Sequence, residues 1–209
     1  MPESAIPRWL QWAQEIQALS QTGLTYSNSP YEVQRYTRFM EIAAEIVAGH
    51  TSLDREETLA DFHTQPGYAT PKVDVRGAVV RDGQILLVQE RVDGLWCMPG
   101  GWADVGDQPS EMVVREVLEE SGFHVVARKL AGVFDANRSG RPLSLYHAYK
   151  LVFLCDIVDG EARGSDETLA AGFFPFDGLP PLSSNRTNER HLAEVRAHLH
   201  DPARPAAFD

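Results

Sequence analysis

The sequence predicts an α+β protein in which a small helical domain precedes a domain of mixed strands and helices. Two amphipathic helical patterns occupy about the first 50 residues. Short runs rich in β-branched and aromatic residues follow from Lys72 onward. Strands and helices do not alternate regularly there, so we expect an α+β or sandwich arrangement rather than a doubly wound parallel sheet.

The first two helices are expected in the stretches IPRWLQWAQEIQALSQ and SPYEVQRYTRFMEIAAEIVAG, where apolar residues recur at helical spacing. Ser29 and Pro30 suit the cap and the first position of the second helix. Two helices cannot cover both apolar faces by themselves, so a third layer is needed, either the rest of the chain or a second copy. We favour helix packing over ligand binding for the aromatic residues on these faces.

A linker is expected after a short charged helix, where Pro66, Gly67 and Pro71 interrupt regular structure. We therefore predict an N-terminal helical domain with its linker over residues 1–66 and a second domain over 67–209.

The second domain begins with strands in VDVRGAVV and QILLVQE, joined by an Asp-Gly turn. After a helix, further strands are expected in HVVARKLAGVF, LYHAYKLVFLCDIV and GFFPF. TNERHLAEVRAHL has a helical apolar stripe, and we expect the tail DPARPAAFD to fray.

Composition excludes several classes of protein. The net charge of −11 argues against binding a nucleic-acid polymer, which requires a basic surface. No apolar run approaches the ~20 residues that span a bilayer, and the N-terminal stretch does not resemble a secretory signal, so we expect a cytoplasmic protein without a membrane partner. Cys97 and Cys155 each lie in an apolar stretch and are expected to be buried thiols.

One stretch, PGGWADVGDQPSEMVVREVLEESGF, carries a concentrated set of acidic residues. Pro109 suits the start of a helix and Gly122 its end, which puts Glu116, Glu119 and Glu120 on one face. Repulsion among these carboxylates and with the helix dipole costs about 1 to 3 kcal/mol. A bound divalent cation would offset that cost.

An ordinary solvated helix face is the competing interpretation of these glutamates. The adjacent glycines Gly100 and Gly101 favour a site instead, because they let a backbone loop approach a ligand or an ion closely.

The same stretch resembles the Nudix box, G-x5-E-x7-R-E-U-x-E-E-x-G-U, in which U is a bulky apolar residue. The residues in register are Gly101, Asp107, Arg115, Glu116, Val117, Glu119, Glu120, Gly122 and Phe123. Every defined position matches except the first glutamate, which is Asp107 here. The resemblance covers roughly residues 72 to 200 and implies a Nudix α/β/α sandwich with a mixed sheet.

The resemblance implies a Mg²⁺- or Mn²⁺-dependent hydrolase of nucleoside diphosphates linked to a moiety X. It assigns metal binding to Glu116, Glu119, Glu120 and the carbonyl of Gly101, with one glutamate as an alternative general base. It implies that Arg115 orients the glutamates by ion pairing. Glu167, with Asp166 as its rival, stands where family members often supply a further acid. We expect Asp107 to retain activity, because it occupies a supporting position.

A subset of the family with an N-terminal helical extension resembles this chain further. That subset implies CDP-choline or ADP-ribose as substrate and a homodimer formed through the extension. Two alternatives are a sanitising nucleoside triphosphate pyrophosphatase of the 8-oxo-dGTP type and a non-catalytic Nudix sensor.

Candidate substrate contacts are residues that could meet a phosphate, a base or a choline group. They are Arg76, Arg91, Trp96, Phe134, Tyr146 and Tyr149. Each could instead be a core or surface residue of the sheet.

Overall fold

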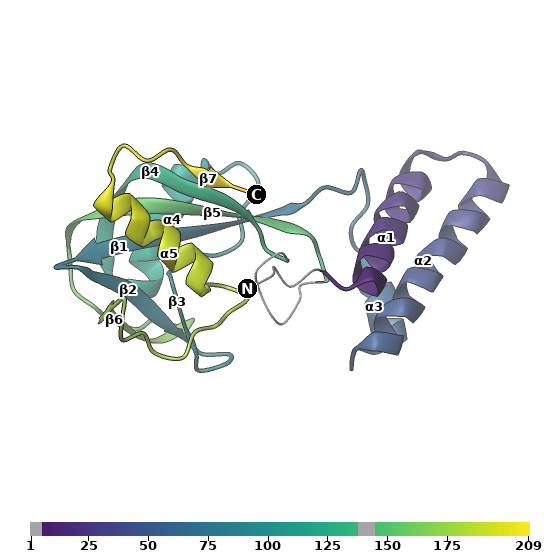
Figure 1. Cartoon of the computed structure of the whole chain (residues 1–209). Coiled ribbons are helices and arrows are strands. Elements are labelled where there is room, and N and C mark those ends of the chain that lie inside the picture. Colours follow the sequence, from purple (N-terminus) through teal and green to yellow (C-terminus); the bar gives the residue numbers. More distant parts are fainter. Residues whose placement is uncertain (1–5, 138–144) are drawn as a thin grey trace. The chain divides into compact units, whose positions relative to one another are not determined.

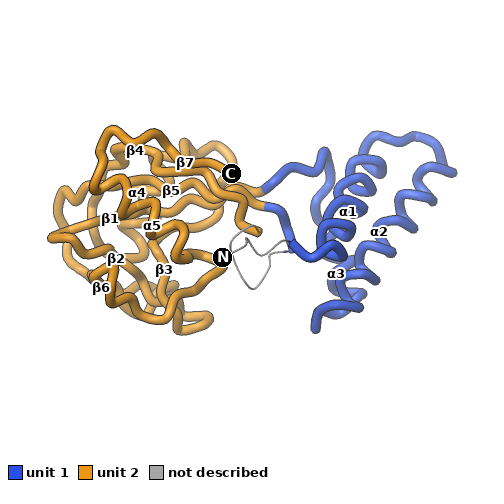
Figure 2. The backbone as a smooth tube through the Cα atoms, in the orientation of Figure 1, with its two compact units in different colours: residues 1–71, 145–147 blue, residues 72–144, 148–209 orange. Residues whose placement is uncertain are grey.

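A computed structural model describes residues 6–137 and 145–209. The chain divides into two compact units, which Figure 2 colours separately. Unit 1 contains residues 1–71 and 145–147, and unit 2 contains residues 72–144 and 148–209. No helix among the described residues is long and apolar enough to cross a membrane.

Unit 1 consists of three helices: α1 (Arg8–Tyr26), α2 (Pro30–His50) and α3 (Arg55–His63) (Figure 1). The N-terminal helical region is thus confirmed, and α2 begins at Pro30 after the cap residue Ser29. The third layer comes partly from α3, whose Phe62 is buried in the core of the unit together with Met40 and Val47.

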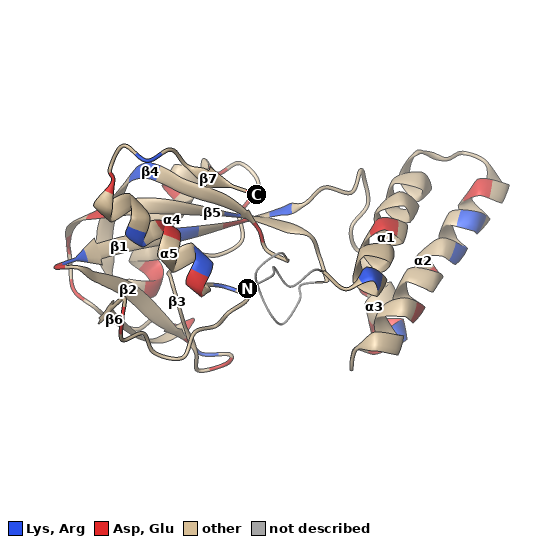
Figure 3. Cartoon of the chain, in the orientation of Figure 1, with Lys and Arg blue, Asp and Glu red and all other residues tan. Residues whose placement is uncertain are grey.

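Acidic and basic positions are interspersed along α2 (Figure 3). Arg38 pairs with Glu41 and with Glu45, each at 2.9 Å. Exposed pairs of this kind contribute little to stability. They mark the side of α2 that carries them as exposed to solvent.

Unit 2 is built on a seven-stranded sheet. Its elements are β1 (Lys72–Arg81), β2 (Gln84–Glu90), β3 (Trp96–Cys97), α4 (Pro109–Ser121), β4 (Phe123–Asp135), β5 (Ala148–Gly160), β6 (Thr168–Pro175), α5 (Glu189–His200) and β7 (Ala207–Phe208). The strand order is β3-β2-β1-β5-β4-β7, and β6 pairs with β2. Strand β1 runs parallel to β5 and antiparallel to β2, so the sheet is mixed as predicted.

The two helices of unit 2 cover opposite faces of the sheet (Figure 1). Val113 and Val117 of α4 share a core with Val75 and Val79 of β1. On the other face, α5 packs against alternate sheet residues in a second core. Because successive side chains of a strand point to opposite faces, the sheet contributes to a core on each side. The predicted sandwich is therefore confirmed.

The predicted limits of α4 are confirmed: Pro109 is its first residue, and Gly122 caps it with a φ of 82°. Both cysteines are buried free thiols, as expected. The C-terminal tail differs from the prediction of fraying. Its β7 pairs with β4, and the Asp209 carboxylate accepts a hydrogen bond from the Asp135 N–H at 2.6 Å. Hydrogen bonding to the sheet edge holds the tail in place.

Candidate active site

The loop between β3 and α4 lies directly against β1. The N–H of Val75 donates to the carbonyl of Gly101 at 2.9 Å, and the N–H of Gly77 donates to the carbonyl of Pro99 at 2.8 Å. Gly100 has a φ of +139°, and a Cβ there would lie 2.0 Å from the Val75 carbonyl oxygen. Only glycine fits this position without displacing the backbone.

The side chain of Glu120, on α4, points into the protein and contacts this loop. Its Oε2 accepts a hydrogen bond from the Gly100 N–H at 2.8 Å, and the residue is 6% exposed. Burial raises the pKa of Glu120 to about 7, against the lowering effect of the nearby Arg76 charge. The acidic face of α4 is therefore not a uniformly solvated surface.

Glu116 lies beside the second glycine of the loop. A Cβ placed on Gly101 would lie 3.1 Å from Oε2 of Glu116. Burial raises the pKa of Glu116, and the charges of Glu119 and Glu167 raise it further. Glu119 itself is exposed. The loop before β6 thus brings Glu167 close enough to act electrostatically on Glu116.

Arg91 holds the loop that carries Glu167. Its Nε donates to the carbonyl of Asp166 at 3.0 Å, and its Nη2 donates to the carbonyl of Ser165 at 3.1 Å. Its backbone N–H also donates to the carbonyl of Glu167 at 3.2 Å. In this structure the guanidinium that we predicted as a phosphate contact supports the acidic loop.

Asp107 is the ion-pair partner of Arg115. The carboxylate Oδ2 lies 2.6 Å from Nη1 of Arg115, and Asp104 lies 3.5 Å from the same guanidinium. The hydrogen bond to Asp107 raises the pKa of Arg115, and the charges of Glu116 and Glu119 raise it further. Arg115 therefore bridges the loop at the start of the box and the acidic helix.

The glutamates fit a divalent cation by chemistry. Within residues 6–137 and 145–209, no three His, Cys, Asp or Glu side chains are already gathered as a complete metal-binding group. The available donors are nevertheless carboxylate oxygens, which suit hard cations. Burial and mutual repulsion raise the pKa of Glu116 and Glu120, and a cation would relieve both penalties. The Gly101 carbonyl already accepts one hydrogen bond and keeps a second lone pair.

The predicted aromatic contacts lie mainly in packing positions. Trp96 meets Phe174 edge to face at 4.7 Å between ring centroids. Phe134 is 2% exposed in the core of unit 2. Tyr146 packs in unit 1, and Tyr149 is half-exposed on β5. Substrate binding by these four residues stays a prediction.

The sequence interpretation named Arg76 as a phosphate contact but missed the buried charged cluster beside the glycine loop to which Arg76 belongs. Asp74 accepts hydrogen bonds from Arg76 at 2.9 and 2.8 Å and from Lys150 at 3.0 Å. These residues line a cavity of about 130 Å³, together with Trp102 and Arg186. A signal was present, because Lys150 is a charged residue directly before the apolar run LVFLC of a predicted strand.

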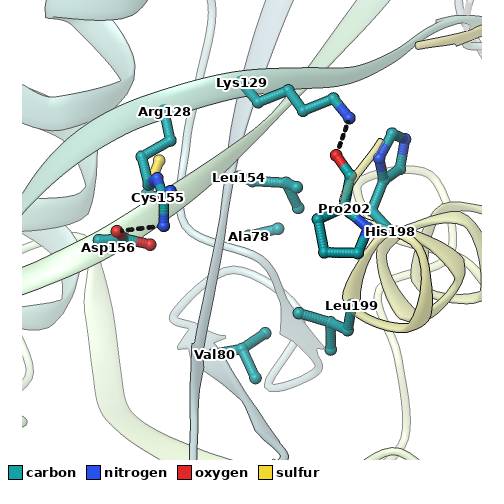
Figure 4. Close-up of a pocket in the computed structure, with 10 residues that line it drawn as sticks. All are labelled: Ala78, Val80, Arg128, Lys129, Leu154, Cys155, Asp156, His198, Leu199 and Pro202. Carbon is teal, nitrogen blue, oxygen red and sulfur yellow. Dashed lines mark hydrogen bonds and ion pairs between the residues drawn. The ribbon is translucent and has the colours of Figure 1, made fainter. Parts of the chain in front are cut away.

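A larger cavity of about 370 Å³ lies between α5 and the sheet. Figure 4 shows its apolar floor, with Ala78, Val80 and Leu154, and an ion pair between Arg128 and Asp156 at its side. This cavity lies on the face of the sheet that α5 covers, whereas the glutamates belong to α4 on the opposite face. We therefore place the candidate active site at the glycine loop.

Comparisons with known proteins cover both units. Residues 7–62 match the family described as "UDP-X-like, N-terminal oligomerisation domain", and residues 71–195 match the family described as "NUDIX domain". A Bacillus subtilis protein named "Putative ADP-ribose pyrophosphatase YjhB" is 41% identical over 202 residues, which is 97% of each chain.

Two solved structures are also similar. The structure of an ADP-ribose pyrophosphatase from Streptococcus suis is 37% identical with a TM-score of 0.62, and the match covers 67% of this chain and all of that one. The structure of a UDP-X diphosphatase is 31% identical with a TM-score of 0.63, and the match covers 96% of this chain and 98% of that one.

Proposed function

Because this chain belongs to the Nudix hydrolase family, we propose that it is a Mg²⁺-dependent pyrophosphohydrolase acting on ADP-ribose, CDP-choline or both. At the coarser level it is a hydrolase of the ADP-ribose pyrophosphatase and UDP-X diphosphatase type. The proposed reaction adds water to the diphosphate and releases two monophosphates.

The observation that carries this proposal is the placement of the acidic helix against the glycine loop. Glu120 accepts the Gly100 N–H, and Glu116 lies beside Gly101. The charge of Glu167 also acts on Glu116 from the loop before β6. Two carboxylates of α4 thus lie at a backbone segment with no side-chain bulk, where a diphosphate can approach, and the charge of Glu167 acts on one of them.

Glu116, Glu119 and Glu120 would hold the Mg²⁺ ions, with the carbonyl of Gly101 as a further oxygen ligand. Bound Mg²⁺ neutralises phosphate charge and lowers the pKa of water. Mn²⁺ would fit the same oxygen ligands.

The remaining groups would position the glutamates and move a proton. Arg115, held by Asp107 at 2.6 Å, would keep the acidic helix and the loop in register. Glu167 would accept a proton from the attacking water, with Asp166 as the alternative acid on the same loop. The backbone contacts of Arg91 would keep that loop in place.

Assays with a panel of substrates test this function. With purified protein and Mg²⁺, we expect release of monophosphates from ADP-ribose or CDP-choline, and weaker turnover of 8-oxo-dGTP. Glu119→Gln and Glu120→Gln should each lower kcat by at least about 100-fold, the size typical of losing an electrostatic catalytic group. Glu111→Gln, in the first turn of the same helix, is the matched control and should keep full activity.

Undiminished turnover in Glu119→Gln and Glu120→Gln would contradict the assignment of the site. No cleavage of any diphosphate would favour a non-catalytic Nudix sensor instead. Preference for 8-oxo-dGTP would favour the sanitising class.

We also propose a homodimer formed through unit 1. Residues 7–62 match an oligomerisation domain, and Leu19, Tyr26 and Phe39 are exposed around a cavity of about 630 Å³ between α1 and α2. Exposed apolar surface of this kind marks a protein interface. Light scattering should give a dimer for the parent protein and a monomer for Leu19→Asp combined with Phe39→Asp. A dimeric mass for the double variant would remove this surface from the interface.

A further inference from the structure

More cationic than acidic side chains line the cavity beside the glycine loop. Asp74, Arg76 and Lys150 are 5%, 4% and 2% exposed, and the single carboxylate of Asp74 faces both cations. The charge of Glu120 also acts on Arg76, whereas Asp74 is the carboxylate that acts on Lys150. An uncompensated buried charge is costly, whereas a bound anion would balance it.

Arg76 has few hydrogen-bond donors left for a ligand. Its Nε and Nη2 donate to Asp74, and its Nη1 donates to the carbonyl of Met98 at 3.2 Å and contacts Sγ of Cys97 at 3.8 Å. A guanidinium has five N–H donors, so these contacts occupy most of them. Arg76 is thereby held as part of the wall.

Lys150 is in the opposite situation. An ammonium has three N–H donors, and within residues 6–137 and 145–209 its one hydrogen-bond partner is Asp74, at 3.0 Å. Its side chain lines the cavity. Two donors of a buried cation therefore remain for whatever enters that space.

A second lysine of the same unit, Lys129, provides a comparison, because the protein itself supplies hydrogen-bond acceptors for its ammonium group. Lys129 lies at the cavity under α5, and its Nζ donates to the carbonyl of Pro202 at 2.9 Å, as Figure 4 shows. It also donates to the carbonyl of Arg204 at 2.5 Å. Backbone oxygens thus hold Lys129, whereas no backbone carbonyl among the described residues does this for Lys150.

The other cation at the rim is already balanced. Arg186 pairs with Glu90 at 3.1 Å and with Asp93 at 3.2 Å. Trp102, which is half-exposed, also lines the cavity and follows Gly101 directly in the chain. The cavity and the helix glutamates are therefore neighbours along the same loop.

We propose that Lys150 binds a phosphate of the substrate in this cavity, with Asp74 and Arg76 as positioning residues. The inference rests on the proposed function and names the cation that meets the phosphate. The bound group is either the phosphate on the nucleoside side of the cleaved bond or the phosphate on the X side.

The electrostatic environment of Lys150 agrees with this role. Burial, together with the neighbouring Arg76 charge, lowers the pKa of Lys150 to about 8. A phosphate in contact with the ammonium would raise that pKa again. Binding should therefore weaken as the pH rises above 8, because the ammonium loses its proton.

Metal-free binding measurements separate this inference from catalysis. Isothermal titration in EDTA would compare AMP, ribose 5-phosphate and adenosine, since AMP and ribose 5-phosphate represent the two phosphate sources. We expect at least one monophosphate to bind the parent protein, and adenosine to bind much more weakly. Lys150→Met should weaken that monophosphate about tenfold or more, the effect of losing a charged hydrogen bond, whereas Lys150→Arg should retain part of the affinity.

Lys129→Met is the matched control and should bind like the parent protein, because it removes the same charge at the other cavity. Circular dichroism would confirm that Lys150→Met is folded, which we expect because Asp74 and Arg76 remain a neutral pair. If Lys150→Met weakens the binding of AMP alone, the cavity binds the phosphate on the nucleoside side. If it weakens the binding of ribose 5-phosphate alone, the cavity binds the phosphate on the X side.

Equal affinity of the parent protein, Lys150→Met and Lys129→Met for both monophosphates would overturn the inference. This outcome would leave the proposed hydrolase activity intact, because no step of the measurement requires cleavage. Conversely, Lys150-dependent binding without any turnover would support the phosphate site while the proposed function failed.

Discussion

Replacing Glu120 by Gln should stabilise the metal-free protein at alkaline pH. The carboxylate is 6% exposed, and it accepts one hydrogen bond from the Gly100 N–H at 2.8 Å. Glutamine keeps a side-chain oxygen that can accept the same bond, so the change removes the charge with little loss of packing. The variant separates the cost of the buried charge from the shape of the site.

The size of the effect follows from the pKa of Glu120, which burial raises from 4.5 to about 7. The folded state holds this proton to higher pH than the unfolded state does. The stability contribution of the protonated carboxyl is therefore fully present below pH 4.5 and is lost as the pH rises through 7. Each pKa unit corresponds to about 1.4 kcal/mol, so the full penalty at pH 8 is at most about 3.5 kcal/mol.

Denaturant unfolding in EDTA, followed by circular dichroism at about pH 4.5 and about pH 8, would measure this difference. We expect Glu120→Gln to gain about 2 to 3 kcal/mol over the parent protein at the higher pH, and much less at the lower pH. Adding Mg²⁺ should stabilise the parent protein more than the variant. Glu111→Gln, with an exposed side chain on the same helix, should match the parent protein throughout.

Lower stability of Glu120→Gln at pH 8 would refute the reasoning, because it would show that the ionised carboxylate is favourable in the fold. An identical pH dependence in both proteins would refute it equally, since another group would then be responsible.

Three further predictions concern the backbone and the two supporting arginines. Gly100→Ala should lose more than about 2 kcal/mol of unfolding free energy in denaturant titrations, because its Cβ would meet a β1 carbonyl. Arg91→Ala should lower kcat, as Glu167→Gln should, without changing the melting temperature much. An unchanged kcat would show that the contacts of Arg91 with the loop that carries Glu167 do not contribute to catalysis. Asp107→Ala should lower kcat/KM through Arg115, and Asp107→Glu should restore it; equal activity of all three proteins would make the 2.6 Å ion pair dispensable.

Much of the acidic helix could be predicted from the sequence because its signals are local. Pro109 and Gly122 set the ends of the helix through the missing N–H of proline and the left-handed conformation of glycine. The spacing of the glutamates likewise placed them on one helix. Their unequal burial, with Glu119 exposed and Glu120 buried, depends on the glycine loop that packs against one side only.

The sequence interpretation went furthest wrong at the C-terminal tail. The stretch DPARPAAFD contains two prolines and no strand pattern, so local reasoning favoured fraying. The tail becomes ordered because the edge of β4 offers unpaired backbone groups, which β7 uses. Such an opportunity exists only once the sheet has formed.

By itself, the sequence determined the two helical and mixed regions, the acidic helix and the resemblance to the Nudix box, because periodicity, caps and motif spacing are properties of neighbouring residues. Only the tertiary structure decided which distant groups meet. Asp74 and Lys150 are separated by 76 positions, yet they face each other across the parallel pair of β1 and β5. That register depends on the packing of the whole sheet, and it sets the charge of the cavity beside the glycine loop.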